Sequence, residues 1–236
     1  MEEAASQNRT DTINLSWSDT VRFIRQLGHD LRNHLNAIER QSAYIVELEA
    51  SAELKGEIAR LREMISALTS SLQKISGRVA EVRPSLISYR ASEFIEDLRS
   101  KIEREFPDKS GEITWPTQPH QAVLNIDPQL LHEAFMELLA NAFQHERGSG
   151  AVLLDGKIDN NRFVFTLREP KTRFELSVEN WGRQPLRTTS RGHYGLGLHR
   201  ARAIVEAHGG EMHVHYDPKG SILVTTLALP ISREES

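Results

Sequence analysis

The sequence of 236 residues contains no cysteine, which excludes disulfides, thiolate catalysis and metal sites with cysteine ligands. It also lacks any apolar run close to the roughly 18 residues that a transmembrane helix requires. Residues 1–4 carry neither the basic region nor the apolar segment of an export signal. The sequence therefore predicts a cytoplasmic protein that does not contact membranes.

An excess of positive charge is also missing. Lysine and arginine together number 29 against 33 acidic residues, and the formal net charge is -4. A nucleic-acid binder needs clustered basic residues in clear excess, so this class of function is excluded. A chain of this length can bury the cores of two modest domains, and the residue patterns divide it in that way.

The first half of the chain is patterned as a helical hairpin. Residues 1–15 are polar and without periodicity, which predicts a flexible tail. A weaker apolar pattern over residues 17–49, followed by a short link at 49–52, predicts two helices that fold back antiparallel. The second helix carries a heptad pattern, with apolar residues at alternating intervals of four and three: Leu54, Ile58, Leu61, Ile65, Leu68, Leu72, Ile75 and Val79.

A lone hairpin would leave half of this apolar seam in water. Pairing two hairpins into a four-helix bundle covers the seam, so the sequence predicts a homodimer. Pro84 and the Ser85 that follows predict the end of the second helix. We therefore expect a helical domain at residues 16–83 and a second domain at 84–236.

The second domain has a mixed pattern of helices and strands. Helices are expected at 94–106, 128–145 and 197–208, and strands at 151–158, 162–168, 173–179, 211–216 and 221–229. Turn residues separate the strands, which predicts an antiparallel sheet with helices covering one face. The fold class of the whole chain is therefore α+β.

His29 is the first residue that could carry chemistry. It lies one position after Gly28, which occupies a seam position on the first helix, so its ring should lie beside the seam and reach solvent. An exposed imidazole can accept a phosphoryl group on one nitrogen while the other is held by a hydrogen bond. Asp30 could orient the ring or accept its proton, and Asn33 returns to the same helix face. Taken alone, such a histidine is more often a plain surface residue.

A second group lies on the helix expected at 128–145. Glu137, Asn141 and His145 follow one another at intervals of four and form a column on one helix face. Oxygen ligands such as the Asn141 carboxamide suit Mg²⁺, which bridges phosphate oxygens. The alternative is a solvated helix face, with His145 favourable at the C-terminus of the helix.

A short glycine-rich segment precedes the helix expected at 197–208. Its residues are Gly195, Leu196, Gly197 and Leu198. Glycines permit close approach of the backbone, and the first free amides of a helix attract phosphate. On its own the segment is weak evidence for phosphate binding, because such turn-to-helix junctions are usually structural.

Together, and in this order, the three segments resemble the catalytic core of bacterial sensor histidine kinases. Residues 29–33 (His-Asp-Leu-Arg-Asn) are similar to the H box of that family, and 137–145 (Glu-Leu-Leu-Ala-Asn-Ala-Phe-Gln-His) to its N box. Residues 194–198 (Tyr-Gly-Leu-Gly-Leu), continued by 204–210, are similar to its G2 box. The similarity covers roughly residues 17–231 and implies a nucleotide domain of the GHKL type, shared with gyrase and heat-shock chaperone ATPases.

The resemblance implies a role for each matching residue. His29 would be the phosphoacceptor, Asp30 its acid–base partner, and Asn33 an aid to phosphatase action. Asn141 would be a Mg²⁺ ligand and Glu137 a residue of the metal shell or a base. ATP would be bound by His145, Asn180, Gly182, Gly195, Leu196, Gly197 and Leu198.

The sequence also departs from the family. The Asp-x-Gly-x-Gly adenine box is present only as residues 178–182, with Asn180 at the position of the adenine-binding aspartate. An asparagine carbonyl can still accept one hydrogen bond from the adenine amine. Twelve residues separate Gly182 from Gly195, which makes the nucleotide lid short. His34 replaces the usual proline, so the first helix should be less bent.

The resemblance predicts a homodimeric kinase that phosphorylates His29 from MgATP and passes the group to an aspartate of a response-regulator receiver domain. Its signal would come from an upstream sensor protein or through the N-terminal tail. An alternative is a histidine phosphotransferase or response-regulator phosphatase whose ATP-binding domain is degenerate. A third hypothesis, a non-kinase ATPase, would leave His29 without a role.

Overall fold

The computed structural model describes residues 17–47, 51–115, 122–174, 178, 181–183 and 195–232. The chain forms two compact units that divide between Ala80 and Glu81. Within the described residues, no helix combines the length and the hydrophobicity that crossing a membrane requires. Each unit is described by itself below.

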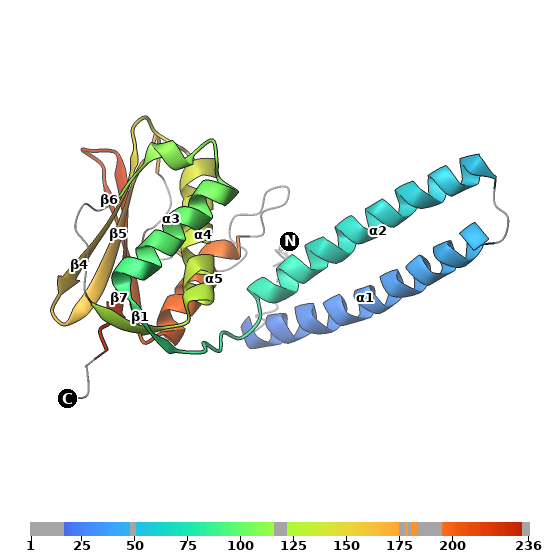
Figure 1. Ribbon diagram of the computed structural model, residues 1–236, viewed down its shortest axis with the longest axis horizontal. Coiled ribbons are helices and arrows are strands. Elements are labelled where there is room, and N and C mark those ends of the chain that lie inside the picture. The colour runs from blue at the N-terminus through green and yellow to red at the C-terminus, as the bar shows by residue number, and fades with distance from the viewer. Residues whose placement is uncertain are drawn as a thin grey trace, which may run out of the picture. The chain divides into compact units, whose positions relative to one another are not determined.

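The first unit is the expected pair of helices, α1 (Trp17–Glu47) and α2 (Ala52–Arg78) (Figure 1). Ser51 caps α2, because its hydroxyl accepts a hydrogen bond from the Leu54 amide at 3.3 Å. The prediction that Pro84 and Ser85 end this helix is wrong. The helix ends at Arg78, where the Ala80 amide bonds to the Gly77 carbonyl and tightens the last turn.

The heptad seam of α2 is only half covered within one chain. Ile58, Ile65 and Val79 are buried, whereas Leu54, Leu61 and Leu68 are 43–55% exposed. Helix α1 also exposes large apolar side chains, namely those of Phe23, Leu27, Leu31, Ile38 and Tyr44. The hairpin therefore buries one row of apolar residues and leaves another row in contact with water, as the heptad pattern predicts.

The second unit is a five-stranded sheet with helices on one face, as expected (Figure 1). The strand order is β2 (Ile113–Thr114), β4 (Val152–Asp159), β5 (Arg162–Pro170), β7 (Ile222–Pro230) and β6 (Glu211–Asp217). All pairs are antiparallel except β2–β4, which is parallel. The covering helices are α3 (Ala91–Glu105), α4 (Pro128–Gln144) and α5 (Gly197–Ala207).

Three features of this unit differ from the sequence prediction. An antiparallel sheet without a strand at 113–114 was expected, whereas β2 lies there and pairs parallel with β4. A separate antiparallel pair, β1 (Ile87–Arg90) with β3 (Val123–Ile126), was not expected, because both strands are only four residues long. The strand predicted at 173–179 is wrong in its described part: Arg173 and Phe174 belong to no strand, and β5 pairs with β7 instead. Phe174 packs against Trp181 and Tyr216, so its apolar character reflects aromatic packing.

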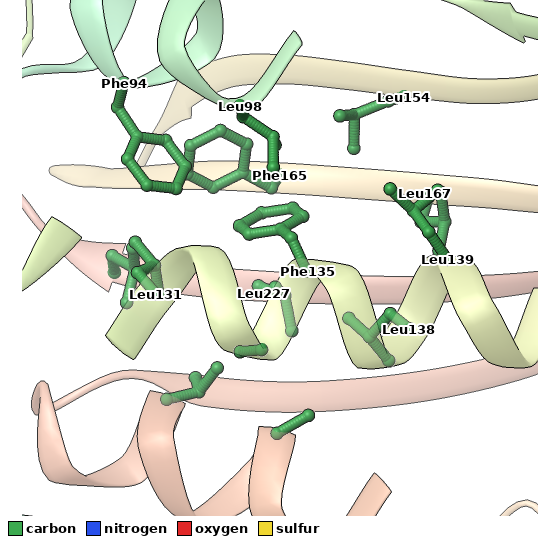
Figure 2. Packing of buried hydrophobic residues seen from close by; sticks show 14 of the residues in the cluster. Phe94, Leu98, Leu131, Phe135, Leu138, Leu139, Leu154, Phe165, Leu167 and Leu227 are labelled. Carbon is green, nitrogen blue, oxygen red and sulfur yellow. The ribbon is translucent and has the colours of Figure 1, made fainter. Parts of the chain in front are cut away.

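Helix α4 is fixed on the sheet by an aromatic core (Figure 2). Phe135 lies 5.0 Å from Phe165 of β5 and 5.7 Å from Phe94 of α3, measured between ring centroids. At the start of the helix, the Asp127 carboxylate accepts hydrogen bonds from the amides of Gln129 and Leu130 at 3.1 Å. These contacts hold the helix that carries Glu137 and Asn141.

A buried ion pair supports the far end of α4. Lys171 Nζ lies 2.8 Å from Glu169 Oε2, and both side chains are only 2% exposed. The same ammonium group donates to the His145 carbonyl at 2.8 Å. Burial raises the pKa of Glu169, although Lys171 partly offsets this effect.

Replacing Lys171 with Met should lower the free energy of unfolding by about 3–5 kcal/mol, because Glu169 would remain buried without its partner. The free energy of unfolding should fall clearly less in the double variant Glu169→Leu/Lys171→Met, since both charges are removed. Urea unfolding of the three proteins tests this. A double variant as unstable as the single one would show that the pair itself is strongly stabilising.

Candidate functional site

His29 lies on α1 with its side chain 65% exposed, while the neighbouring Gly28 is buried. A β-carbon on Gly28 would come within 2.8 Å of the Ser76 hydroxyl, so this glycine lets α1 and α2 approach closely. As predicted from the seam position of Gly28, the imidazole beside it reaches solvent. A partner molecule can therefore reach the ring without any change in the packing of the two helices.

The other two candidates on α1 both contact Nδ1 of the His29 ring. Asp30 Oδ1 and Asn33 Nδ2 each lie 3.3 Å from this nitrogen. One nitrogen cannot donate to the carboxylate and accept from the carboxamide at once, so the two contacts correspond to two tautomers. With Asp30 as partner, Nδ1 carries the proton and Nε2 has a free lone pair. With Asn33 as partner, Nε2 carries the proton and is not nucleophilic.

The Asp30 carboxylate is held in its charged form. A hydrogen bond from the Gln26 side chain at 2.9 Å is the largest cause that lowers the pKa of Asp30, and the contact with His29 adds to it. Gln26 was missed in the sequence, although its position four residues before Asp30 on the same helix was the available signal. At neutral pH, Asp30 therefore acts as a fixed negative charge beside the ring.

In the second unit, Glu137 of α4 meets the first residue of α5. Both Glu137 and Asn141 are half-buried residues of α4. A β-carbon on Gly197 would overlap the Glu137 carboxylate, so this carboxylate fills the place that a side chain would otherwise take. The sequence candidates Glu137 and Gly197, sixty residues apart, are thus neighbours in the fold.

The glycine-rich turn leads directly into the N-terminus of α5. Gly195 has φ +62°, a conformation that favours glycine, and Leu196 is buried at 1% exposure. Helix α5 begins at Gly197, so the positive end of its dipole lies at this turn. Such a helix start, next to half-exposed glycines, can bind a phosphate group.

Gly182 brings a third segment to the same place. It is buried with φ +69°, and a β-carbon on it would lie 2.9 Å from the Leu198 carbonyl oxygen. His199 also forms a hydrogen bond with the backbone of Gly182, and burial lowers the pKa of this histidine. The turn at Trp181 and Gly182 is therefore packed against the start of α5. Asn180, the other residue predicted here, lies outside the described residues.

His145 takes a different position from the other N-box candidates. It ends α4 as its C-cap residue, and its carbonyl accepts the hydrogen bond from Lys171. The contacts that join Glu137 to Gly197 and Gly182 to Leu198 lie nearer the middle of α4 and the start of α5. His145 thus has a described structural role at the end of the helix, whereas binding of nucleotide by its side chain stays a prediction.

The donor set suits Mg²⁺ carried by a nucleotide better than a metal held by protein alone. Among the described residues, no group of three or more His, Asp or Glu side chains could hold a metal ion. Glu137 and Asn141 offer oxygen ligands one turn apart, and Mg²⁺ usually combines one or two such ligands with water and phosphate oxygens. The half-exposed pair therefore fits MgATP.

Comparison with known proteins agrees with this geometry. Residues 126–232 match the family model of the histidine kinase-, DNA gyrase B- and HSP90-like ATPases. The chain is 26% identical over 161 residues to the sensor histidine kinase SpaK of Bacillus subtilis, a match that covers 66% of this chain and 32% of SpaK. It is also 26% identical over 215 residues to the sensor histidine kinase HprS of Escherichia coli, covering 87% of this chain and 46% of HprS.

The fold agrees as well. The crystal structure of full-length ShkA in complex with AMPPNP superposes with a TM-score of 0.64 at 19% identity, covering 91% of this chain and 47% of ShkA. Residues 126–232 thus form an ATPase domain of the histidine kinase, gyrase B and HSP90 type. Beyond this domain the chain is similar to sensor histidine kinases, as the match to HprS over 87% of this chain shows. It spans less than half the length of the curated relatives that it matches.

Replacing Gln26 with Leu should raise the pKa of Asp30 toward its ordinary value of 3.8, because the largest stabilising hydrogen bond is removed. In the unmodified protein, the carboxylate should stay ionised to lower pH than in this variant. NMR titration of the Asp30 carboxyl carbon measures the shift, with Gln73→Leu on the exposed surface of α2 as control. Equal midpoints in all three proteins would contradict the assignment.

Proposed function

We propose that this chain is the catalytic core of a two-component histidine kinase. In this function, the γ-phosphoryl group of ATP is transferred to His29 and then to an aspartate of a response-regulator receiver domain. The observation that carries the proposal is the exposed His29 ring with Nδ1 held by Asp30, in a chain that also contains an ATPase domain. A non-kinase ATPase would have no use for this arrangement.

The tautomer with Asp30 as partner is the one suited to the reaction. The Nε2 lone pair attacks the γ-phosphorus, a phosphorus–nitrogen bond forms, the bond to the β–γ bridging oxygen breaks, and ADP leaves. Asp30 stabilises the positive charge that develops on the ring. Because the pKa of Asp30 is lowered, this carboxylate is a weak base, and the Nδ1 proton then passes to solvent.

The nucleotide would lie where α4, α5 and the Gly182 turn meet. The amides at the start of α5, after Gly195 and Gly197, are suited to the phosphates, with Leu196 and Leu198 shaping the turn. Asn141 and Glu137 would hold Mg²⁺, which neutralises phosphate charge when bound. The turn at Asn180 and Gly182 would contact adenine, in line with the family resemblance.

Asn33 supports a second candidate function on the same residues. Its carboxamide lies 3.3 Å from His29 Nδ1 and favours the tautomer in which Nε2 is not nucleophilic. A histidine in that state, with a carboxamide beside it that can hold a water molecule, suits removal of phosphate from a response regulator. We therefore include phosphatase activity in the proposal, with Asn33 as the residue on which it depends.

The kinase acts as a homodimer in this proposal. The exposed apolar row of α2, made of Leu54, Leu61 and Leu68, continues at seven-residue intervals and matches the geometry of a bundle seam. Burial of such side chains contributes about 25 cal/mol per Å² of apolar surface removed from water. A second hairpin would cover the row and produce a four-helix bundle.

His29→Gln should abolish labelling of the protein by [γ-³²P]ATP with Mg²⁺, because the acceptor nitrogen is lost. The label on the unmodified protein should be labile in acid and stable in base, as expected of phosphohistidine. His34→Gln is the matched control, since it removes another exposed histidine of α1. Label that persists in His29→Gln, or fails to form in the unmodified protein, would contradict the kinase proposal.

Leu68→Glu should convert the dimer into monomers, since it places a charge in the exposed apolar row of α2. Light scattering coupled to gel filtration measures the mass of each species. Ser66→Glu adds the same charge to an exposed position on another side of α2 and should leave the dimer intact. The dimer proposal fails if the unmodified chain is itself a monomer, or if Leu68→Glu keeps the dimer mass.

A further inference from the structure

Arg202 is a charged residue inside the second unit, and it has no role in the proposed phosphoryl transfer. It lies in the second turn of α5 with a side chain that is 9% exposed. Its guanidinium donates to two backbone carbonyls, that of Met212 through Nη1 at 2.8 Å and that of Trp181 through Nη2 at 2.9 Å. Met212 lies in β6, and Trp181 directly precedes Gly182.

The two hydrogen bonds join three separate segments of the chain: α5, β6 and the turn at Trp181. Arg202 ties the Trp181 turn to β6, and it does so from the helix whose first turn follows the glycine-rich segment. The same turn touches α5 at a second point, where Gly182 packs on the Leu198 carbonyl. The turn and the start of α5 are thereby held at one fixed spacing, although Gly182 and Gly195 are separated by twelve residues.

A charge at this position is costly for the fold. Burial lowers the pKa of Arg202, and the nearby Arg183 adds to this effect. The Glu206 carboxylate pairs with Arg202 only at 3.8 Å and is itself 59% exposed. Because an apolar side chain would avoid the desolvation cost, the arginine indicates a demand for geometry rather than for stability alone.

We propose that Arg202 is a positioning residue of the nucleotide site. Its forked guanidinium holds the Gly182 turn, which would contact the adenine base, against the start of α5, which would contact the phosphates. The inference rests on the proposed binding of ATP at these segments. Arginine is suited to this task because its planar donors are fixed relative to one another, whereas lysine offers a single point of charge on a flexible stem.

The proposal predicts an uneven effect on two ligands of the full-length chain. Arg202→Met should weaken MgATP binding at least tenfold, because the adenosine part loses its aligned turn. Magnesium tripolyphosphate, used as a competitor, has no adenosine, so its binding should weaken by less than threefold. Arg202→Lys should show the same pattern and provides the measurement if Arg202→Met does not fold, as judged by circular dichroism.

Arg200→Met is the matched control, because Arg200 is another buried arginine of α5 but pairs with Glu133 of α4 at 3.0 Å. Arg200→Met should weaken the binding of the two ligands by similar factors. Equal weakening of the binding of both ligands in the Arg202 variants, or no weakening, would overturn the positioning role without contradicting the proposed binding of ATP. An unmodified protein that binds neither ligand would instead refute the proposed function itself.

Discussion

The second unit depends on the close approach of three backbone segments at points where a β-carbon would not fit. Gly197 leaves room for the Glu137 carboxylate of α4, and Gly182 leaves room for the Leu198 carbonyl of α5. Such approaches need rigid neighbours, and α4 is rigid because Phe135 is packed in the aromatic core and Asp127 caps its first turn. The core therefore determines where the candidate polar groups meet.

In the helical unit, too, a glycine allows two segments to approach closely. Gly28 lets α1 and α2 approach at Ser76, and the residue beside it, His29, remains exposed. Asp30 and Asn33 compete for one ring nitrogen of His29, Nδ1. A choice between two tautomers at one nitrogen offers a simple physical basis for the proposed kinase and phosphatase activities, because only one tautomer has a nucleophilic Nε2.

The sequence was informative where a pattern repeats or a motif has a fixed order, and less so where tertiary contacts decide. The heptad seam and the long helices were predictable because apolar periodicity directly reports burial. The end of α2 at Arg78 and the non-strand state of Phe174 were not, since a turn hydrogen bond and aromatic packing decide them. The contribution of Arg202 also needed the fold, because its two acceptor carbonyls come from distant segments.

The central claim is that one chain combines a phosphoacceptor histidine with a working ATP site. The most direct test is calorimetric titration of the protein with ATP and Mg²⁺, with Asn141→Ala as the site variant and Asn125→Ala, at an exposed position of β3, as its control. The account predicts saturable binding that is lost in Asn141→Ala and kept in Asn125→Ala. Absence of binding at millimolar ATP would contradict it and would leave a protein that receives its phosphoryl group from another protein.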